Sequence, residues 1–168
     1  IIFSIITGQW QKSLVFMAGG SAMALLGWRD DVKSLPARVR LVVQGLVALA
    51  TLAGLGYFQV LPFPFIGEIP LGVVGILVTV VWIVGMANAY NFMDGIDGIA
   101  GGVAVAGGLG WMTLILAGAD SLNGLAFYLA LAIAATSLGF LVHNWSPARI
   151  FMGDVGSVFL GYSFAVIP

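Results

Sequence analysis

The chain has 168 residues, of which 61% are hydrophobic and only 8% are charged. A soluble domain is about 45–50% apolar and about 25% charged, so the composition excludes an ordinary soluble fold. The net charge of −1 provides no basic surface for nucleic acid, and the absence of cysteine excludes disulfides and thiolate metal sites.

Several apolar runs approach the length of about 20 residues that a membrane-spanning helix needs. Lipid offers the backbone no hydrogen-bond partner, and the runs are continuous rather than alternating, so helices are predicted and a barrel is not. In chain order the predicted spans are 13–28, 39–58, 71–90, 100–118, 122–142 and 155–168. The predicted fold class is therefore all-α, a polytopic transmembrane helical bundle with about six spans.

The segments between these spans fall alternately on the two faces of the membrane. One face receives 29–38, 91–99 and 143–154, and the other receives 59–70 and a short turn at 119–121. The basic residues on or beside the first face are Arg29, Lys33, Arg38, Arg40 and Arg149. The second face has no Lys or Arg in its two segments, although Lys12 precedes the first span. The positive-inside rule therefore predicts that the first face is cytoplasmic.

Carboxylates gather on the same face, which no topology rule requires. They are Asp30, Asp31, Asp94, Asp97 and Asp154, whereas only Glu68 and Asp120 belong to the other face. Mutual repulsion disfavours such a group unless a cation or basic side chains lie among its members. The three segments of the first face are therefore the predicted functional site.

Each segment also permits a purely structural interpretation. Asp30 and Asp31 suit a divalent ion or proton transfer, but an aspartate at a helix end is also a common cap. The Asp-Gly pairs at Asp94 and Asp97 predict a tight turn. The helix that follows could offer its free amides to a phosphate, or the segment could be a plain turn without a ligand. Asp154 is equally a metal ligand or a helix N-cap.

Three blocks of residues, taken together, resemble the polyprenyl-phosphate N-acetylhexosamine-1-phosphate transferases, which form glycosyltransferase family 4. The blocks are Asp30-Asp31 followed by Leu35-Pro36-Ala37-Arg38; the stretch 88–102; and Pro147-Ala148-Arg149 with 151–157. The resemblance covers nearly all of the chain from Gly27 onward. Within this family, the chain resembles the undecaprenyl-phosphate N-acetylglucosaminyl 1-phosphate transferases and the O-antigen initiators more than the peptidoglycan enzyme.

The resemblance implies an integral-membrane enzyme that transfers a sugar 1-phosphate from a UDP-N-acetyl sugar to undecaprenyl phosphate and releases UMP. It implies Mg²⁺, with Mn²⁺ as a substitute, and initiation of a cell-envelope polysaccharide such as lipopolysaccharide. The implied location is the bacterial plasma membrane, with the site on the cytoplasmic side. The resemblance leaves open whether the protein forms a homodimer. A secondary transporter that uses the same carboxylates for ion coupling is the alternative, although transporters place such groups near the bilayer midplane.

The resemblance also assigns roles to individual residues. Asp154 is expected to bind the metal, with Asp94 as a second ligand. The expected catalytic residues are Asp30, Asp31, Asp94 and Asp97, with Asp30 as the preferred base for the lipid phosphate. The expected substrate-binding residues are Asn88, Asn91, Arg149 and Lys33. Residues 1–168 are expected to be one catalytic domain, truncated at both ends and inactive alone, because the family's early helices and a later cytoplasmic loop are missing.

Overall fold

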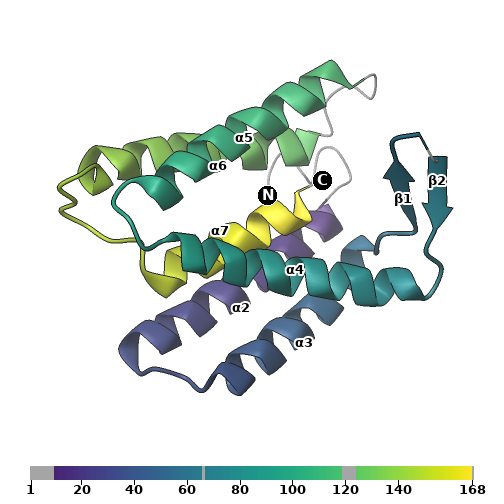
Figure 1. Ribbon diagram of the computed structural model, residues 1–168, viewed down its shortest axis with the longest axis horizontal. Helices are drawn as coiled ribbons and strands as arrows, with labels where there is room; N and C mark the ends of the chain where they lie inside the picture. The colour runs from purple at the N-terminus through teal and green to yellow at the C-terminus, as the bar shows by residue number, and fades with distance from the viewer. Residues whose placement is uncertain (1–9, 66, 119–123, 168) are drawn as a thin grey trace.

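The computed structural model describes residues 10–65, 67–118 and 124–167 (Figure 1). The elements in these residues are α2 (Trp10–Val32), α3 (Ala37–Leu55), β1 (Val60–Phe63), β2 (Gly67–Pro70), α4 (Val74–Met93), α5 (Ile99–Ala117), α6 (Gly124–Asn144) and α7 (Gly153–Val166). Each predicted span corresponds to one of these helices, so the all-α fold class is confirmed. The turn expected at 119–121, including Asp120, lies outside the described residues.

Four of the described helices, α3, α4, α5 and α6, are long and apolar enough to cross a membrane by length and composition. Large apolar side chains on these helices are exposed rather than packed, among them Leu46, Leu77, Leu116 and Leu138. Such surfaces are unfavourable in water and favourable against lipid tails. The chain is therefore described as a helical membrane protein.

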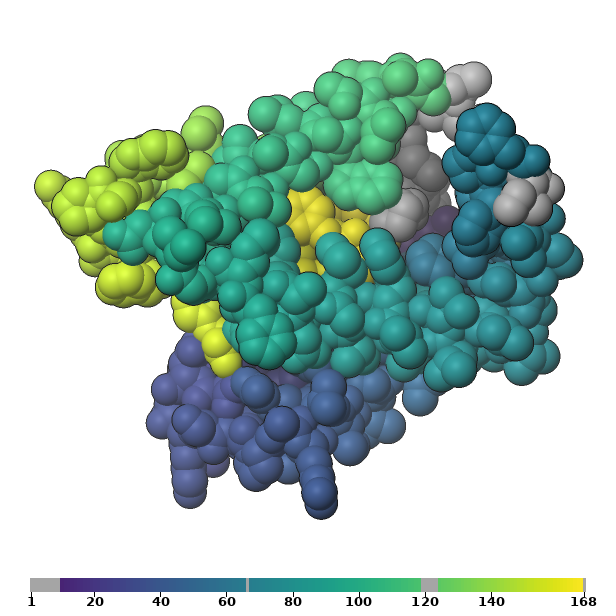
Figure 2. All heavy atoms as spheres, in the orientation of Figure 1, coloured from purple at the N-terminus to yellow at the C-terminus, as the bar shows by residue number. Residues whose placement is uncertain are grey.

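Helix α7 lies in the middle of the molecule, against α2 on one side and α4 on the other, while α5 and α6 pair with each other (Figure 1). Figure 2 shows only parts of α7, above α4 toward α5 and at the edge between α4 and α2, because its neighbours cover the rest. Its buried Tyr162 packs against Phe16 of α2, with ring centroids 5.9 Å apart, and shares a 3.1 Å hydrogen bond with Thr51 of α3. This central position fixes the start of α7 relative to three other helices.

All three connections of the predicted functional face lie at the same end of the molecule (Figure 1). The helices extend further into these connections than the apolar runs predict: α2 continues past residue 28 to Val32, α4 past 90 to Met93, and α7 begins at Gly153 rather than at 155. Helical hydrogen bonding does not depend on side-chain polarity, so a helix continues into polar residues. As a result, Asp30, Asp31 and Asp154 lie on helix ends rather than in loops.

The segment 59–70, expected as a plain loop, instead forms an antiparallel hairpin in which Val60 pairs with Pro70 and Phe63 with Gly67. The hairpin projects at the opposite end from the three connections (Figure 1). Strands of four residues that contain proline are too short to show a clear alternating pattern, so the sequence did not predict them. Glu68 belongs to β2 and is far from the other described carboxylates.

Candidate active site

Asp30 is a buried carboxylate in the last turn of α2, with an exposed fraction of 9%. Its Oδ1 accepts a hydrogen bond from the Leu35 N–H at 2.5 Å, and its Oδ2 forms an ion pair with Arg40 Nη1 at 2.6 Å. A negative charge is unfavourable at a helix C-terminus, so Asp30 does not stabilise its own helix as a cap. The capping interpretation is therefore wrong for Asp30, whose charge is balanced by Arg40.

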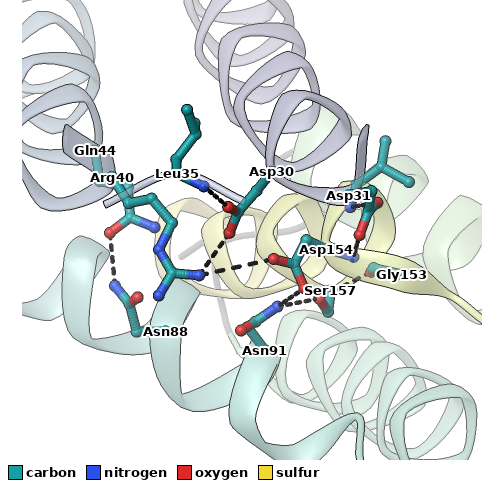
Figure 3. A network of polar contacts seen from close by, with 11 residues as sticks. Asp30, Asp31, Leu35, Arg40, Gln44, Asn88, Asn91, Gly153, Asp154 and Ser157 are labelled. Atoms are coloured by element: carbon teal, nitrogen blue, oxygen red, sulfur yellow. Dashed lines mark hydrogen bonds and ion pairs between the residues drawn. The ribbon is translucent and has the colours of Figure 1, made fainter. Parts of the chain in front are cut away.

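Arg40 belongs to the site, although the sequence analysis used this residue only to predict the topology. It lies in the first turn of α3, and its Nη1 is also 3.8 Å from Asp154 Oδ2 (Figure 3). One guanidinium therefore lies between the carboxylates of two distant segments. Arg40 is thus a basic side chain among the gathered carboxylates, one of the two ways, a cation or basic groups, in which the sequence analysis allowed their repulsion to be offset. Its position ten residues after Asp30 in the chain gave no periodic signal for the contact.

Asn91 connects the second segment to the third. Its Nδ2 donates to Asp154 Oδ1 at 2.7 Å and to Ser157 Oγ at 2.9 Å (Figure 3). Ser157, which the sequence interpretation did not assign, is one turn after Asp154 on α7 and donates to the Gly153 carbonyl at 3.0 Å. Asp154 is not the N-cap of α7, since that position is Met152 and has no side-chain cap. Its carboxylate is instead turned toward α3 and α4.

Asn88 lies one helical turn before Asn91 on α4, but its amide is turned toward α3. Its Nδ2 donates to Gln44 Oε1 at 2.6 Å and to the Val84 carbonyl at 2.7 Å. Gln44 is almost completely buried, with 1% of its surface exposed. The contact joins α4 to α3 next to Arg40 (Figure 3), so Asn88 helps to hold these two helices together at the site.

Asp31 and Asp94 complete the group of carboxylates. Asp31 follows Asp30 on α2 and accepts backbone hydrogen bonds from Asp154 at 2.9 Å and Val155 at 3.1 Å. Asp94 is the C-terminal cap position of α4 and is half-buried. Its N–H donates to the Asn91 carbonyl at 3.2 Å, which ends the helix, and Asp94 is near enough to Asp154 and Asp31 for their charges to act on it. Asp30, Asp31, Asp94 and Asp154 are therefore brought together from three segments. With Arg40, Gln44, Asn88, Asn91 and Ser157 they form what we call the polar group.

Three predicted residues lie outside this polar group. Asp97 Oδ2 accepts the Ala148 N–H at 3.0 Å, so it joins the α4–α5 connection to the α6–α7 connection. The buried Asn144 strengthens the same joint, since it accepts from the Gly98 N–H and donates to the Ile150 carbonyl. The Gly98 amide at the start of α5 is thus occupied by Asn144. Lys33 and Arg149 are both exposed and bond through their backbones.

The four carboxylates carry more negative charge than Arg40 alone balances. Burial raises the pKa of Asp154, and the charges of Asp31 and Asp30 raise it further, whereas the hydrogen bond from Asn91 opposes this. Burial, Asp154 and Asp31 raise the pKa of Asp94. Burial alone would raise the pKa of Asp30, but the Leu35 N–H, the Asp154 carboxyl and Arg40 together lower it. A bound cation would relieve this repulsion.

The side chains gathered here, carboxylates and an amide, carry the oxygen ligands that a magnesium ion takes. Within the described ranges, no group of three or more His, Cys, Asp or Glu side chains is arranged to hold a metal. Magnesium needs fewer, because it is usually bound by one or two carboxylates together with substrate phosphates and water. Asp154 and Asp94 would supply the carboxylates; burial and, after it, the neighbouring negative charges raise the pKa of both groups.

Comparison of the sequence with known proteins identifies several bacterial relatives. The probable undecaprenyl-phosphate N-acetylglucosaminyl 1-phosphate transferase of Bacillus subtilis (strain 168) is 39% identical over 89% of the chain and 41% of its own length. The phospho-N-acetylmuramoyl-pentapeptide-transferases of Synechococcus sp. (strain JA-3-3Ab) and Chlamydia muridarum are 41% and 36% identical over 86% and 87% of the chain. The chain spans 44% and 50% of the length of these two proteins.

The model of one family matches residues 13–168, which include every residue of the polar group and all of the described helices except the start of α2. This extent confirms the resemblance that the three blocks carry. The chain therefore belongs to glycosyl transferase family 4.

Proposed function

We propose that the protein transfers an N-acetylhexosamine 1-phosphate from a UDP-N-acetyl sugar to undecaprenyl phosphate, which starts a cell-envelope polysaccharide. A phosphate oxygen of the lipid attacks the sugar-linked phosphorus. The bond from that phosphorus to the bridging oxygen breaks, and UMP leaves with this oxygen. The observation that carries the proposal is the group formed by Asp30, Arg40, Asn91 and Asp154, which joins three distant segments at one end of the helices.

The charge pattern of this group matches the demands of the reaction. Both reactants are anionic phosphates, and a bound Mg²⁺ or Mn²⁺ would reduce their repulsion and polarise the diphosphate. Asp154 and Asp94 would hold the ion, and Asn91 orients Asp154 by its hydrogen bond. Arg40 Nη1 lies 2.6 Å from Asp30 and 3.8 Å from Asp154, so its guanidinium is placed to pair with a phosphate oxygen that enters between them.

Asp30 is proposed to accept the last proton of the lipid phosphate. A phosphate monoester has a second pKa of about 6, so at neutral pH most of the acceptor is already a dianion and a weak base is sufficient. This suits Asp30, whose pKa is lowered by the Leu35 N–H, Asp154 and Arg40 against the effect of burial. Direct attack therefore needs no covalent intermediate on the protein.

An apolar groove supports a lipid as the acceptor. It has a volume of about 450 Å³ and lies between α4, α5 and α7, with Trp82, Trp111 and Phe164 among its lining residues. Met93 belongs to the same lining and directly precedes Asp94 in the chain. An isoprenoid chain in this groove would place its phosphate beside the carboxylates. We propose that the groove faces the bilayer of a bacterial plasma membrane, with the polar group on the cytoplasmic side.

The transporter alternative has no comparable support. Ion-coupling carboxylates of transporters lie near the bilayer midplane, on interrupted helices. Here Asp30 lies in the last turn of α2, Asp94 follows the last residue of α4, and Asp154 lies in the first turn of α7. Carboxylates at helix ends favour chemistry at the membrane surface, where a nucleotide sugar in solution meets a lipid phosphate.

The proposal is tested by UMP release from UDP-N-acetylglucosamine, and from other UDP-N-acetyl sugars, in the purified full-length gene product. Release should require both undecaprenyl phosphate and Mg²⁺. Asp154→Asn should lower the rate at least about 100-fold if the carboxylate holds the metal. Glu68→Gln removes a carboxylate at the opposite end and should leave the rate unchanged. A well-folded protein that releases no UMP with any of these donors would contradict the proposal.

A further inference from the structure

Asp31 lies next to Asp30 in the sequence, but its carboxylate makes different contacts. Its Oδ1 accepts the N–H of Asp154 at 2.9 Å, and its Oδ2 accepts the N–H of Val155 at 3.1 Å (Figure 3). Asp30 faces Leu35 and Arg40 on the side of α3. Two adjacent carboxylates therefore serve two different neighbours: one binds the connection to α3, and the other binds α7.

The two amides that Asp31 binds belong to the first turn of α7. The first N–H groups of a helix have no partner within the helix and are satisfied by capping groups. The N-cap position of α7 is Met152, whose side chain provides no cap. Asp31 of α2 therefore provides the cap from a separate helix, and the negative charge at a helix N-terminus adds a favourable interaction with the helix dipole.

The backbone at Gly153 is adapted to this contact. Gly153 has a positive φ of 67°, and a Cβ at this position would lie 2.8 Å from Asp31 Oδ2. The absence of a side chain thus allows the carboxylate to approach the amides. The N–H that Asp31 binds belongs to Asp154 itself. By holding this backbone group, Asp31 fixes the point from which the Asp154 side chain extends.

We propose that Asp31 is a positioning residue that fixes Asp154 by capping α7, and that it is neither the proton acceptor nor a metal ligand. This divides the aspartate pair: Asp30 works on the side of Arg40, and Asp31 holds the metal-binding helix. The catalytic part of the proposal rests on the proposed function, whereas the capping part does not.

Kinetics separate positioning from direct chemistry. Asp31→Asn removes the charge and the basic group but keeps one oxygen that can accept an N–H, whereas Asp31→Ala removes the cap. We expect kcat of the Asn variant to stay within about tenfold of wild type, with an unchanged half-saturating Mg²⁺ concentration, and kcat of the Ala variant to fall further. If Asp31→Asn instead lowers kcat by more than about 100-fold, as loss of a general base does, the proposal is wrong.

Hydrogen–deuterium exchange tests the cap without any activity. In Asp31→Ala the amides of 154–155 should exchange at least about tenfold faster than in wild type, with Asp31→Asn intermediate. The buried α7 residues around Tyr162 should exchange as before, which shows that the variants are folded. Unchanged exchange at 154–155 would overturn the proposal. If wild type releases no UMP, the proposed function fails, and the exchange result still decides whether Asp31 caps α7.

Discussion

Gly27 of α2 packs directly against the backbone of Asp154 at the start of α7. A Cβ on Gly27 would overlap the Asp154 carbonyl and lie 2.7 Å from the Val155 nitrogen. Because the contact is with backbone, no side-chain rotation can relieve it. The close approach brings the last turn of α2, with its two aspartates, within hydrogen-bond distance of α7.

Gly27→Ala is therefore expected to separate α2 from α7. The added methyl group should destabilise the protein by about 1–3 kcal/mol and lower transferase activity, because Asp31 and Asp30 move away from Asp154. Gly45→Ala is the matched control, since a Cβ at this α3 position meets nothing within 4 Å. It should raise stability by about 0.5–1 kcal/mol. Thermal unfolding in detergent compares the two; equal stabilities would refute the close contact.

Arg40→Met should destabilise the protein by about 2 kcal/mol, because it leaves the buried Asp30 carboxylate without its cation. The double variant with Asp30→Asn should recover most of that loss, since no charge is then left unpaired. Arg149→Met, which removes an exposed arginine, should change stability by less than about 0.5 kcal/mol. Denaturant unfolding measures all three. A double variant less stable than Arg40→Met would show that the pair is not coupled.

Asn91→Ala should move the acid limb of the pH–rate profile to higher pH. The hydrogen bond from Asn91 opposes the burial and the negative charges that raise the pKa of Asp154, so its loss raises this pKa further. The ionised carboxylate that binds metal then forms only at higher pH. The pH dependence of UMP release checks the shift. Asn88→Ala, whose amide binds Gln44 rather than a carboxylate, should keep the wild-type acid limb.

Asp94→Asn should raise the melting temperature of the metal-free protein at neutral pH. Burial and the charges of Asp154 and Asp31 raise the pKa of Asp94 above its ordinary 3.8. A carboxyl with a raised pKa contributes stability below pH 3.8 that is lost as pH rises through its folded pKa. Asparagine cannot ionise, so Asp94→Asn removes this loss of stability at neutral pH. It should also reduce the stabilisation that Mg²⁺ gives to wild type, which melting curves with and without Mg²⁺ reveal.

Much of the fold could be predicted from local pattern alone. Long apolar runs require helices in lipid, so the existence and order of the helices followed directly from the sequence. The limits of the helices did not follow, because α2 continues to Val32 and α4 to Met93 through polar residues. The hairpin at 60–70 was missed for the opposite reason: its strands are too short for a periodic signal.

The candidate site could be predicted in part. Asp30, Asp31, Asp94, Asn91 and Asp154 were expected to share one face, and the structure brings them together. Asp97 was grouped with them but binds Ala148 in the joint between two connections. The sequence assigns no role to Arg40, Gln44 or Ser157, since no sequence spacing indicates which side chain a half-buried arginine or a buried amide will meet.

The sequence by itself determined that this protein is a helical membrane protein of one family, with most of its carboxylates predicted on one face. The composition and the length of each apolar run are properties of single segments, so they can be recognised without knowledge of the fold. Only the tertiary structure decided what each carboxylate does. Asp30 and Asp31 are adjacent and chemically identical, and the packing of Gly27 against α7 turns one toward Arg40 and the other toward the Asp154 amide. The role of Asp31 depends on contacts with residues more than 100 positions away, which local pattern does not record.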